Sequence, residues 1–253
     1  MELELIPALQ TQRELYALPR GFERFWKYIE TMTGGTDDLV LPITGMNPMG
    51  HEHNAQMLDS LIAFGAEEVA RATIAEAAGR LAKAEGSLRV CLVVVDDARG
   101  QWTNRYFVEM SRLQSWAEVR RGFATVSVWT SGTWDAEAVR RETLVVVYRN
   151  DYLLRFGVPK TLRQIMKQEG LALAFAGTAG PTLDADDLAY SREVIAPYLE
   201  ATVFPTIFSC LYGDEIAKVS GYTPLGLSAR AGYAVALEEA RQSKMMPERV
   251  LEE

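Results

Sequence analysis

The segment Leu88–Val95 constrains the fold of this chain more than any other segment. Apart from Arg89 it is apolar throughout, and it ends at the adjacent carboxylates Asp96 and Asp97. A strand with one face in water alternates apolar and polar residues, whereas an unbroken apolar run is typical of a strand covered on both faces. Such strands occur in parallel sheets with helices on either side. We therefore expect an α/β fold.

Two further segments are predicted to be strands beside this one. Residues 39–44 are short and apolar, although Pro42 requires a position where no ladder donor is needed. Residues 123–130 alternate and are rich in β-branched residues. Residues 171–176 are a candidate fourth strand, and residues 144–147 are a strand alternative inside an expected helix.

Helical periodicity separates these strands and dominates the C-terminal half. In residues 21–32, the apolar stripe Phe22, Phe25, Trp26 and Ile29 recurs at helical spacing. Residues 51–84 carry a long apolar stripe and are predicted to form the longest helix. The other expected helices span residues 104–120, 135–156, 160–169, 184–200, 206–219 and 224–242.

The alternation of strands and helices defines the expected fold class. Strand, helix, strand, helix, strand and helix follow one another from residue 39 to 156, which is the order of a right-handed parallel sheet. We predict a small parallel, Rossmann-like sheet of about three to five strands flanked by helices, followed by a mainly helical C-terminal half. Residues 1–253 are expected to form a single domain. The alternative is a division into an α/β core, residues 1–157, and a helical part, residues 158–253.

Composition excludes several classes of function. The net charge is −8 and the isoelectric point is about 5.0, so the protein offers no positive field for a nucleic acid or an anionic membrane. No apolar run approaches the roughly 20 residues of a membrane helix, and the N-terminus lacks the pattern of a signal peptide. We therefore expect a cytoplasmic protein with neither a nucleic-acid nor a membrane partner.

Motif searches exclude further chemistry. The two cysteines, Cys91 and Cys210, are too few for a disulfide framework or a four-cysteine zinc site. The phosphate-binding G-x-x-x-x-G-K-[ST], the dinucleotide G-x-G-x-x-G and the hydrolase G-x-S-x-G motifs do not occur.

Polar, glycine-containing segments follow all three expected strands. They span residues 45–54, 96–105 and 131–135, whereas the connections at the opposite edge are plain. Ligands of an open parallel sheet bind beyond the carboxyl ends of its strands. We therefore expect one pocket at this edge, lined by the three segments.

The two histidines of the chain stand together as His51 and His53. Two imidazoles and a carboxylate form a known site for a divalent metal, and Asp96, or alternatively Asp97, would be the third ligand. Alternatively, a histidine acts as an acid or base without metal, or both histidines cap the following helix. His51, His53, Asp96 and Asp97 are accordingly the candidate catalytic residues.

The remaining candidates are polar or aromatic residues of the same segments that would bind a substrate. Helix N-termini and hydroxyls can hold an anion, but helix capping and turn formation explain the same residue types. The candidates are Asn47, Trp102, Asn104, Arg105, Thr130, Ser131 and Thr133.

Two functions of different class remain open. The first is an enzyme that acts on a small polar or anionic metabolite at the sheet edge, with a divalent metal as an optional cofactor. The second is a non-catalytic α/β binding or scaffold protein whose polar residues are structural. The small residues of 224–242 would also allow close helix packing, either within the fold or across a homo-oligomer.

Overall fold

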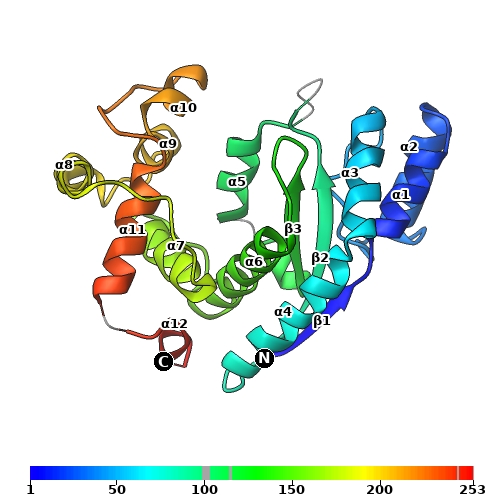
Figure 1. Ribbon diagram of the computed structural model, residues 1–253, viewed down its shortest axis with the longest axis horizontal. Coiled ribbons are helices and arrows are strands. Elements are labelled where there is room, and N and C mark those ends of the chain that lie inside the picture. The colour runs from blue at the N-terminus through cyan, green and yellow to red at the C-terminus, as the bar shows by residue number, and fades with distance from the viewer. Residues whose placement is uncertain (99–102, 114–115, 244, 253) are drawn as a thin grey trace. The chain divides into compact units, whose positions relative to one another are not determined.

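The computed structural model describes residues 1–98, 103–113, 116–243 and 245–252 (Figure 1). Two compact units divide the chain at residue 147: Met1–Val147 and Tyr148–Glu253. Within the described residues, no helix combines the length and the apolar character needed to cross a membrane.

A parallel sheet forms the centre of the first unit. Among the described residues it contains β1 (Glu2–Ile6), β2 (Ser87–Val95) and β3 (Phe123–Trp129), in the order β1-β2-β3. Residues 90–95 of β2 are all fully buried, as the unbroken apolar run predicts. The predicted fold class, a small parallel sheet flanked by helices with a mainly helical C-terminal half, is confirmed.

The prediction of a strand at residues 39–44 is wrong. The amides of Val40 and Leu41 both donate to the carbonyl of Met32, at the end of helix α2 (Phe22–Thr33), so this segment is a loop. Pro42 and Ile43 are buried. The segment is therefore apolar because it fills core space, and it pairs with no strand of the described sheet.

The strand β1 takes the place that residues 39–44 were expected to fill. Its alternation of glutamate and leucine over residues 2–5 has the period of a strand with one polar face. Beyond the end of β1, the side chain of Gln12 from α1 (Leu9–Ala17) continues the pairing. Gln12 Nε2 donates to the carbonyl of Leu92 (2.8 Å), and its Oε1 accepts from the amide of Val94 (3.0 Å). A helix side chain thus satisfies backbone groups of a buried strand.

Helices cover both faces of the sheet (Figure 1). Helices α1, α3 (Glu52–Ala63) and α4 (Ala66–Arg80) contact β1 and β2, while α5 (Arg105–Leu113) lies on the other side. The prediction of one helix over 51–84 is wrong, because the chain breaks at Gly65, where φ is 74°. Glycine adopts this left-handed conformation without the steric cost of a Cβ atom.

The second unit is helical throughout its regular structure. Helix α6 (Ala136–Phe156) leads into it, so residues 144–147 are helical, and the fourth strand predicted at 171–176 lies in α7. Both strand predictions are therefore wrong. The other elements of the C-terminal half are α7 (Leu162–Ala176), α8 (Ala185–Ile195), η2 (Ala196–Tyr198), α9 (Phe204–Tyr212), α10 (Asp214–Val219), α11 (Ala231–Gln242) and α12 (Pro247–Val250).

Helix α11 begins later than the predicted 224–242. The carboxylate of Asp214 accepts from the amides of Leu225 (2.8 Å) and Leu227 (3.0 Å), which holds that segment in a turn. The small residues of α11 are used within the unit. A Cβ atom on Gly232 would lie 2.6 Å from the carbonyl oxygen of Cys210, so α9 and α11 pack backbone to backbone. A homo-oligomer through this helix stays a prediction.

Candidate functional site

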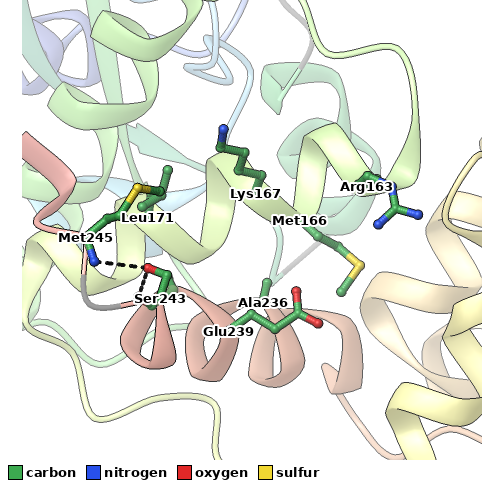
Figure 2. Close-up of a pocket in the computed structure, with 9 residues that line it drawn as sticks. Arg163, Met166, Lys167, Leu171, Ala236, Glu239, Ser243 and Met245 are labelled. Atoms are coloured by element: carbon green, nitrogen blue, oxygen red, sulfur yellow. Dashed lines mark hydrogen bonds between the residues drawn. The ribbon is translucent and has the colours of Figure 1, made fainter. Parts of the chain in front are cut away.

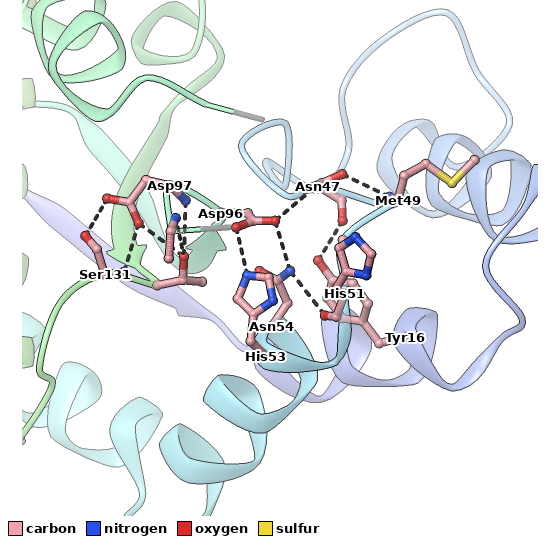
Figure 3. Close-up of polar contacts among 12 residues, drawn as sticks. Tyr16, Asn47, Met49, His51, His53, Asn54, Asp96, Asp97 and Ser131 are labelled. Carbon is pink, nitrogen blue, oxygen red and sulfur yellow. Dashed lines mark hydrogen bonds and ion pairs between the residues drawn. The ribbon is translucent and has the colours of Figure 1, made fainter. Parts of the chain in front are cut away.

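A buried carboxylate at the carboxyl end of β2 organises the candidate site. Asp96 is fully buried and accepts hydrogen bonds from three side chains (Figure 3). His53 Nε2 lies 2.8 Å from its Oδ1, while the amides of Asn47 (3.0 Å) and Asn54 (3.2 Å) donate to its Oδ2. We call these four residues the Asp96 network.

The segment before α3 brings the network together. The chain folds back over residues 47–50, and a Cβ atom on Gly50 would collide with Asn54 Nδ2, so a larger residue there would displace the side chain of Asn54. His53 and Asn54 then lie in the first turn of α3. The tight turn at residues 47–50 therefore brings Asn47, His53 and Asn54 to Asp96, although no strand precedes this segment.

Two residues from α1 and α2 hold this segment in place. Tyr16 donates from its hydroxyl to the carbonyl of Asn47 (2.6 Å). Arg24, which is buried on α2, donates to the carbonyl of Gly50 (3.3 Å). Burial and the negative charge of Asp96 raise the pKa of Tyr16 well above its ordinary value of 10. The hydroxyl therefore stays protonated and acts as a donor.

The hydrogen bonds of Asp96 decide its ionisation state. Burial raises the pKa of a carboxyl group because it disfavours the charged form, but donors to the carboxylate lower it. For Asp96 the largest single influence is burial, which raises the pKa. The donors His53, Asn54 and Asn47 together outweigh it, so the pKa of Asp96 lies below the ordinary value of 3.8. An ionised carboxylate can only accept, so Nε2 of His53 carries a proton, and in the neutral form of the ring Nδ1 then carries the lone pair.

Two buried acceptor atoms of the network lack partners among the described residues. They are Nδ1 of His53 and Oδ1 of Asn54. A buried polar atom without a hydrogen bond costs about 1–3 kcal/mol. Such atoms are rare in folded proteins and point to a bound group or a catalytic role.

The neighbouring carboxylate, Asp97, has a different environment. Its side chain accepts from the hydroxyl of Thr130 (3.1 Å) and from the amide (2.9 Å) and hydroxyl (2.6 Å) of Ser131. These contacts join the segment after β2 to the segment after β3. The shared edge of the sheet brings Asp97 close to Thr130 and Ser131. These contacts use polar groups that were expected to bind a ligand.

Within the described residues, the side chains of the other predicted site residues form no hydrogen bond with the Asp96 network, although the backbone carbonyl of His51 accepts from the side-chain amide of Asn54 (3.3 Å). His51 is exposed and precedes α3 without a side-chain capping bond. Asn104 caps α5, accepting from the amides of Tyr106 (3.1 Å) and Phe107 (3.2 Å). Arg105 is paired with Glu109 (2.7 Å).

Two further residues were predicted to bind a substrate. Thr133 is exposed ahead of α6. Trp102 falls outside the described residues.

The predicted metal site is not assembled within the described part of the chain. There, no group of three histidine, cysteine or acidic side chains lies close enough to hold an ion. Asp96 is joined to His53 alone of the two histidines.

Sequence reasoning missed several residues that build the site. Asn54 was included only as the last residue of the segment 45–54, and Tyr16 and Arg24 were not singled out. One signal was present for Asn54: its side-chain amide, next to His53 at the start of a helix, offers hydrogen-bond donors that a buried carboxylate can accept. Tyr16 and Arg24 gave no local signal, because the carbonyls of Asn47 and Gly50 that accept from them are distant in sequence.

The second unit contains a pocket of about 250 Å³ between α7 and α11 (Figure 2). Its buried floor is apolar and includes Met166 and Leu171, whereas Arg163, Lys167 and Glu239 are exposed at its rim. Arg163 is already paired with Glu200 (2.6 Å). None of the described lining residues is a buried polar group without a partner, which distinguishes this pocket from the Asp96 network.

Comparison with known proteins yields one distant relative. No model of a protein family matches the chain, and no solved structure matches it at a significant level. A protein of Bacillus subtilis (strain 168) named "Uncharacterized protein YjfC" is 26% identical over 251 residues, which cover 87% of this chain and 79% of that protein. Its name describes no activity, so we infer function from the geometry at Asp96.

Proposed function

We propose that this protein is an enzyme that acts on a small polar or anionic metabolite at the carboxyl edge of its sheet. His53 is the general acid and base, and Asp96 is its positioning carboxylate. One observation carries the proposal. His53 is bound to fully buried Asp96 through Nε2 (2.8 Å), while its buried Nδ1 has no partner among the described residues.

The chemistry follows from the tautomer that Asp96 imposes. A substrate O–H or N–H group placed at Nδ1 transfers its proton to that nitrogen and keeps the electron pair of the broken bond. The imidazolium that forms is stabilised by the Asp96 carboxylate. The proton then returns from Nδ1 to the product or the leaving group. Catalysis of this kind contributes typically 10²–10⁴-fold in rate.

An acid–base pair is favoured over a metal centre because Asp96 is already committed to protein donors. Its Oδ1 faces His53, and its Oδ2 accepts from both asparagine amides. These three hydrogen bonds already use three of the roughly four lone-pair sites of the carboxylate. Proton transfer at Nδ1 leaves all of them intact.

The first test concerns the tautomer. The chain has two histidines, so ¹⁵N labelling of the imidazole rings gives two sets of signals, and His51→Gln assigns them. We expect His53 to carry its proton on Nε2 and to lose this preference in Asp96→Asn. A ring protonated at Nδ1 in the wild type contradicts the proposed base.

The second test is turnover. Fractionated polar metabolites are incubated with the protein, and consumption is followed by mass spectrometry. His53→Gln keeps a donor for Asp96 but removes the base, so we expect a loss of about 10²-fold or more. His51→Gln makes the same substitution at an exposed histidine and is the control. It should reduce turnover less than His53→Gln does. Equal turnover in His53→Gln overturns the proposal, and no turnover of any fraction by the wild type favours the binding or scaffold alternative.

A further inference from the structure

Asn54 presents a hydrogen-bond acceptor whose direction is fixed. Both hydrogens of its side-chain amide are used, because Nδ2 donates to Asp96 Oδ2 (3.2 Å) and to the carbonyl of His51 (3.3 Å). A flipped amide would set its oxygen against these two acceptor oxygens. Oδ1 of Asn54 is therefore turned away from both, and it has no partner among the described residues.

The unpartnered acceptors of Asn54 and His53 belong to neighbouring side chains. The two residues are consecutive in the first turn of α3, and they bind the two oxygens of one carboxylate, Asp96 (Figure 3). Asn54 is fully buried, whereas the side chain of His53 is 13% exposed, so the ring is the part of this pair that a ligand meets first. A group that satisfies both Nδ1 of His53 and Oδ1 of Asn54 brings at least two donor hydrogens.

The buried charge of Asp96 is stabilised by uncharged groups. Its described donors are two side-chain amides and the Nε2–H group of His53, a ring that is neutral in the proposed function. A buried charge is normally paired with an opposite charge. Arg24, the buried cation of α2, donates to the carbonyls of Leu18 and Gly50 instead. The network therefore favours a cation over the carboxylate or phosphate end of a metabolite.

We infer that the Asp96 network receives a protonated primary amine and that Asn54 is the residue that selects it. An ammonium group has three N–H donors on one atom, so it can donate to His53 Nδ1 and Asn54 Oδ1 together, whereas a single hydroxyl has one donor. This inference rests on the proposed function and names its substrate class. The proton passes from the ammonium group to Nδ1, and the electron pair of the broken N–H bond stays on the nitrogen, which becomes a neutral amine.

Ammonium ion is the smallest probe of this site, and potassium ion is its matched control. The two ions have nearly the same radius, but potassium has no hydrogen to donate. The ¹⁵N signals of both histidine rings are followed in mildly alkaline buffer while ammonium, potassium or formate is added at constant ionic strength. We expect a saturable change at Nδ1 of His53 with ammonium alone. An equal response to potassium, a response to formate alone, or no response to any of the three overturns the inference.

Asn54→Ala and Asn47→Ala separate the free acceptor from the support of Asp96. Each variant removes one amide that donates to Asp96 Oδ2, but Oδ1 of Asn47 already accepts from the amide of Met49 (3.0 Å). We expect Asn54→Ala to weaken ammonium binding about 10-fold more than Asn47→Ala does, which corresponds to one hydrogen bond with a charged group. Equal weakening overturns the selecting role of Asn54. Where a variant does not fold, the comparison of ammonium with potassium in the wild type decides.

Turnover separates this inference from the proposed function. Acetylation of the amines in an active metabolite fraction should abolish its consumption, because an N-acetyl amide has one N–H donor and no positive charge. Consumption that survives acetylation overturns the amine as substrate and leaves His53 as the base. A His53 ring protonated at Nδ1 in the wild type overturns both.

Discussion

Asp96 in the α/β unit and Asp151 in the helical unit are both fully buried, yet their environments differ. Asp96 accepts from three side chains, and its pKa lies below the ordinary value. Asp151 has one bond, from Arg155 Nε (3.2 Å), and its Oδ2 has no partner among the described residues. Burial raises the pKa of Asp151 to about 6, against the lowering influence of Arg155. Burial alone therefore does not set the charge of an acid, because the number of donors decides it.

The largest expected effect is at Asp96. Asp96→Asn removes the charge that three donors surround and turns one oxygen into a competing donor. We expect the free energy of unfolding to fall by about 3 kcal/mol, as when a buried ion pair loses one partner. Urea unfolding measures this loss. An unchanged stability would mean that the three hydrogen bonds contribute no net stabilisation.

Asp151 should behave in the opposite way. Its native pKa of about 6 exceeds the unfolded value of 3.8, so the native state binds more protons between these pH values. The stability from Asp151 is fully present below pH 3.8 and is lost as pH rises through 6, by up to about 3 kcal/mol. Asp151→Asn should therefore stabilise the protein at pH 8 and flatten this part of the pH profile.

Urea unfolding of the wild type and of Asp151→Asn is measured at several pH values. The difference between their free energies of unfolding at each pH gives the contribution of Asp151. Asp186→Asn, at an exposed acid on α8, provides the control for loss of one charge. If Asp151→Asn destabilises the protein at pH 8, the ion pair with Arg155 outweighs the cost of burial.

A smaller effect should appear where backbone geometry supports the Asp96 network. Gly50→Ala puts a methyl group against the amide of Asn54 and should cost about 1–2 kcal/mol through overpacking. Gly79→Ala in α4 meets open space and should stabilise the protein by about 0.5–1 kcal/mol. Thermal unfolding of the two variants gives the comparison. If Gly50→Ala stabilises the protein as Gly79→Ala does, the loop at Gly50 accommodates the methyl group at no cost.

The smallest effect is expected at Arg155, the cation that is hydrogen-bonded to Asp151. Arg155→Gln removes a favourable charge, so the pKa of Asp151 should rise above 6 by about half a unit. A ¹³C-carboxyl NMR titration measures this shift. A pKa that stays at its wild-type value would mean that solvent already screens Arg155.

Much of the fold was predictable from local patterns. The unbroken run of β2 indicated a doubly covered strand, and the alternation around residue 126 indicated β3. The loop at 39–44 was mistaken for a strand because apolar residues fill core space in loops as well as in sheets. The stripe of α2 predicted a helix correctly but not the exposure of Phe22 and Trp26, because Arg24 and Tyr28 are buried instead, where they bond to backbone carbonyls that no periodicity reveals.

The sequence singled out the segments that meet at Asp96 but not the contacts between them. The rule that ligands bind at the carboxyl ends of parallel strands located the segments around Asn47 and Asp96. The side chains of Asn47 and Asp96 are in contact. The segment around Asn47 was placed there because residues 39–44 were predicted to be a strand, and that prediction was wrong. His51 and His53 were indistinguishable in sequence, as were Asp96 and Asp97.

The sequence by itself determined the types of the elements and the edge of the sheet where polar residues gather. Those properties depend on neighbours within a few residues, whose spacing decides which face is apolar. Only the tertiary structure decided that Asp96 and His53 form the buried pair while Asp97 and His51 do not. Hydrogen bonds fix that choice between residues more than 40 positions apart, and a shift of one residue turns a side chain to the opposite face of a strand.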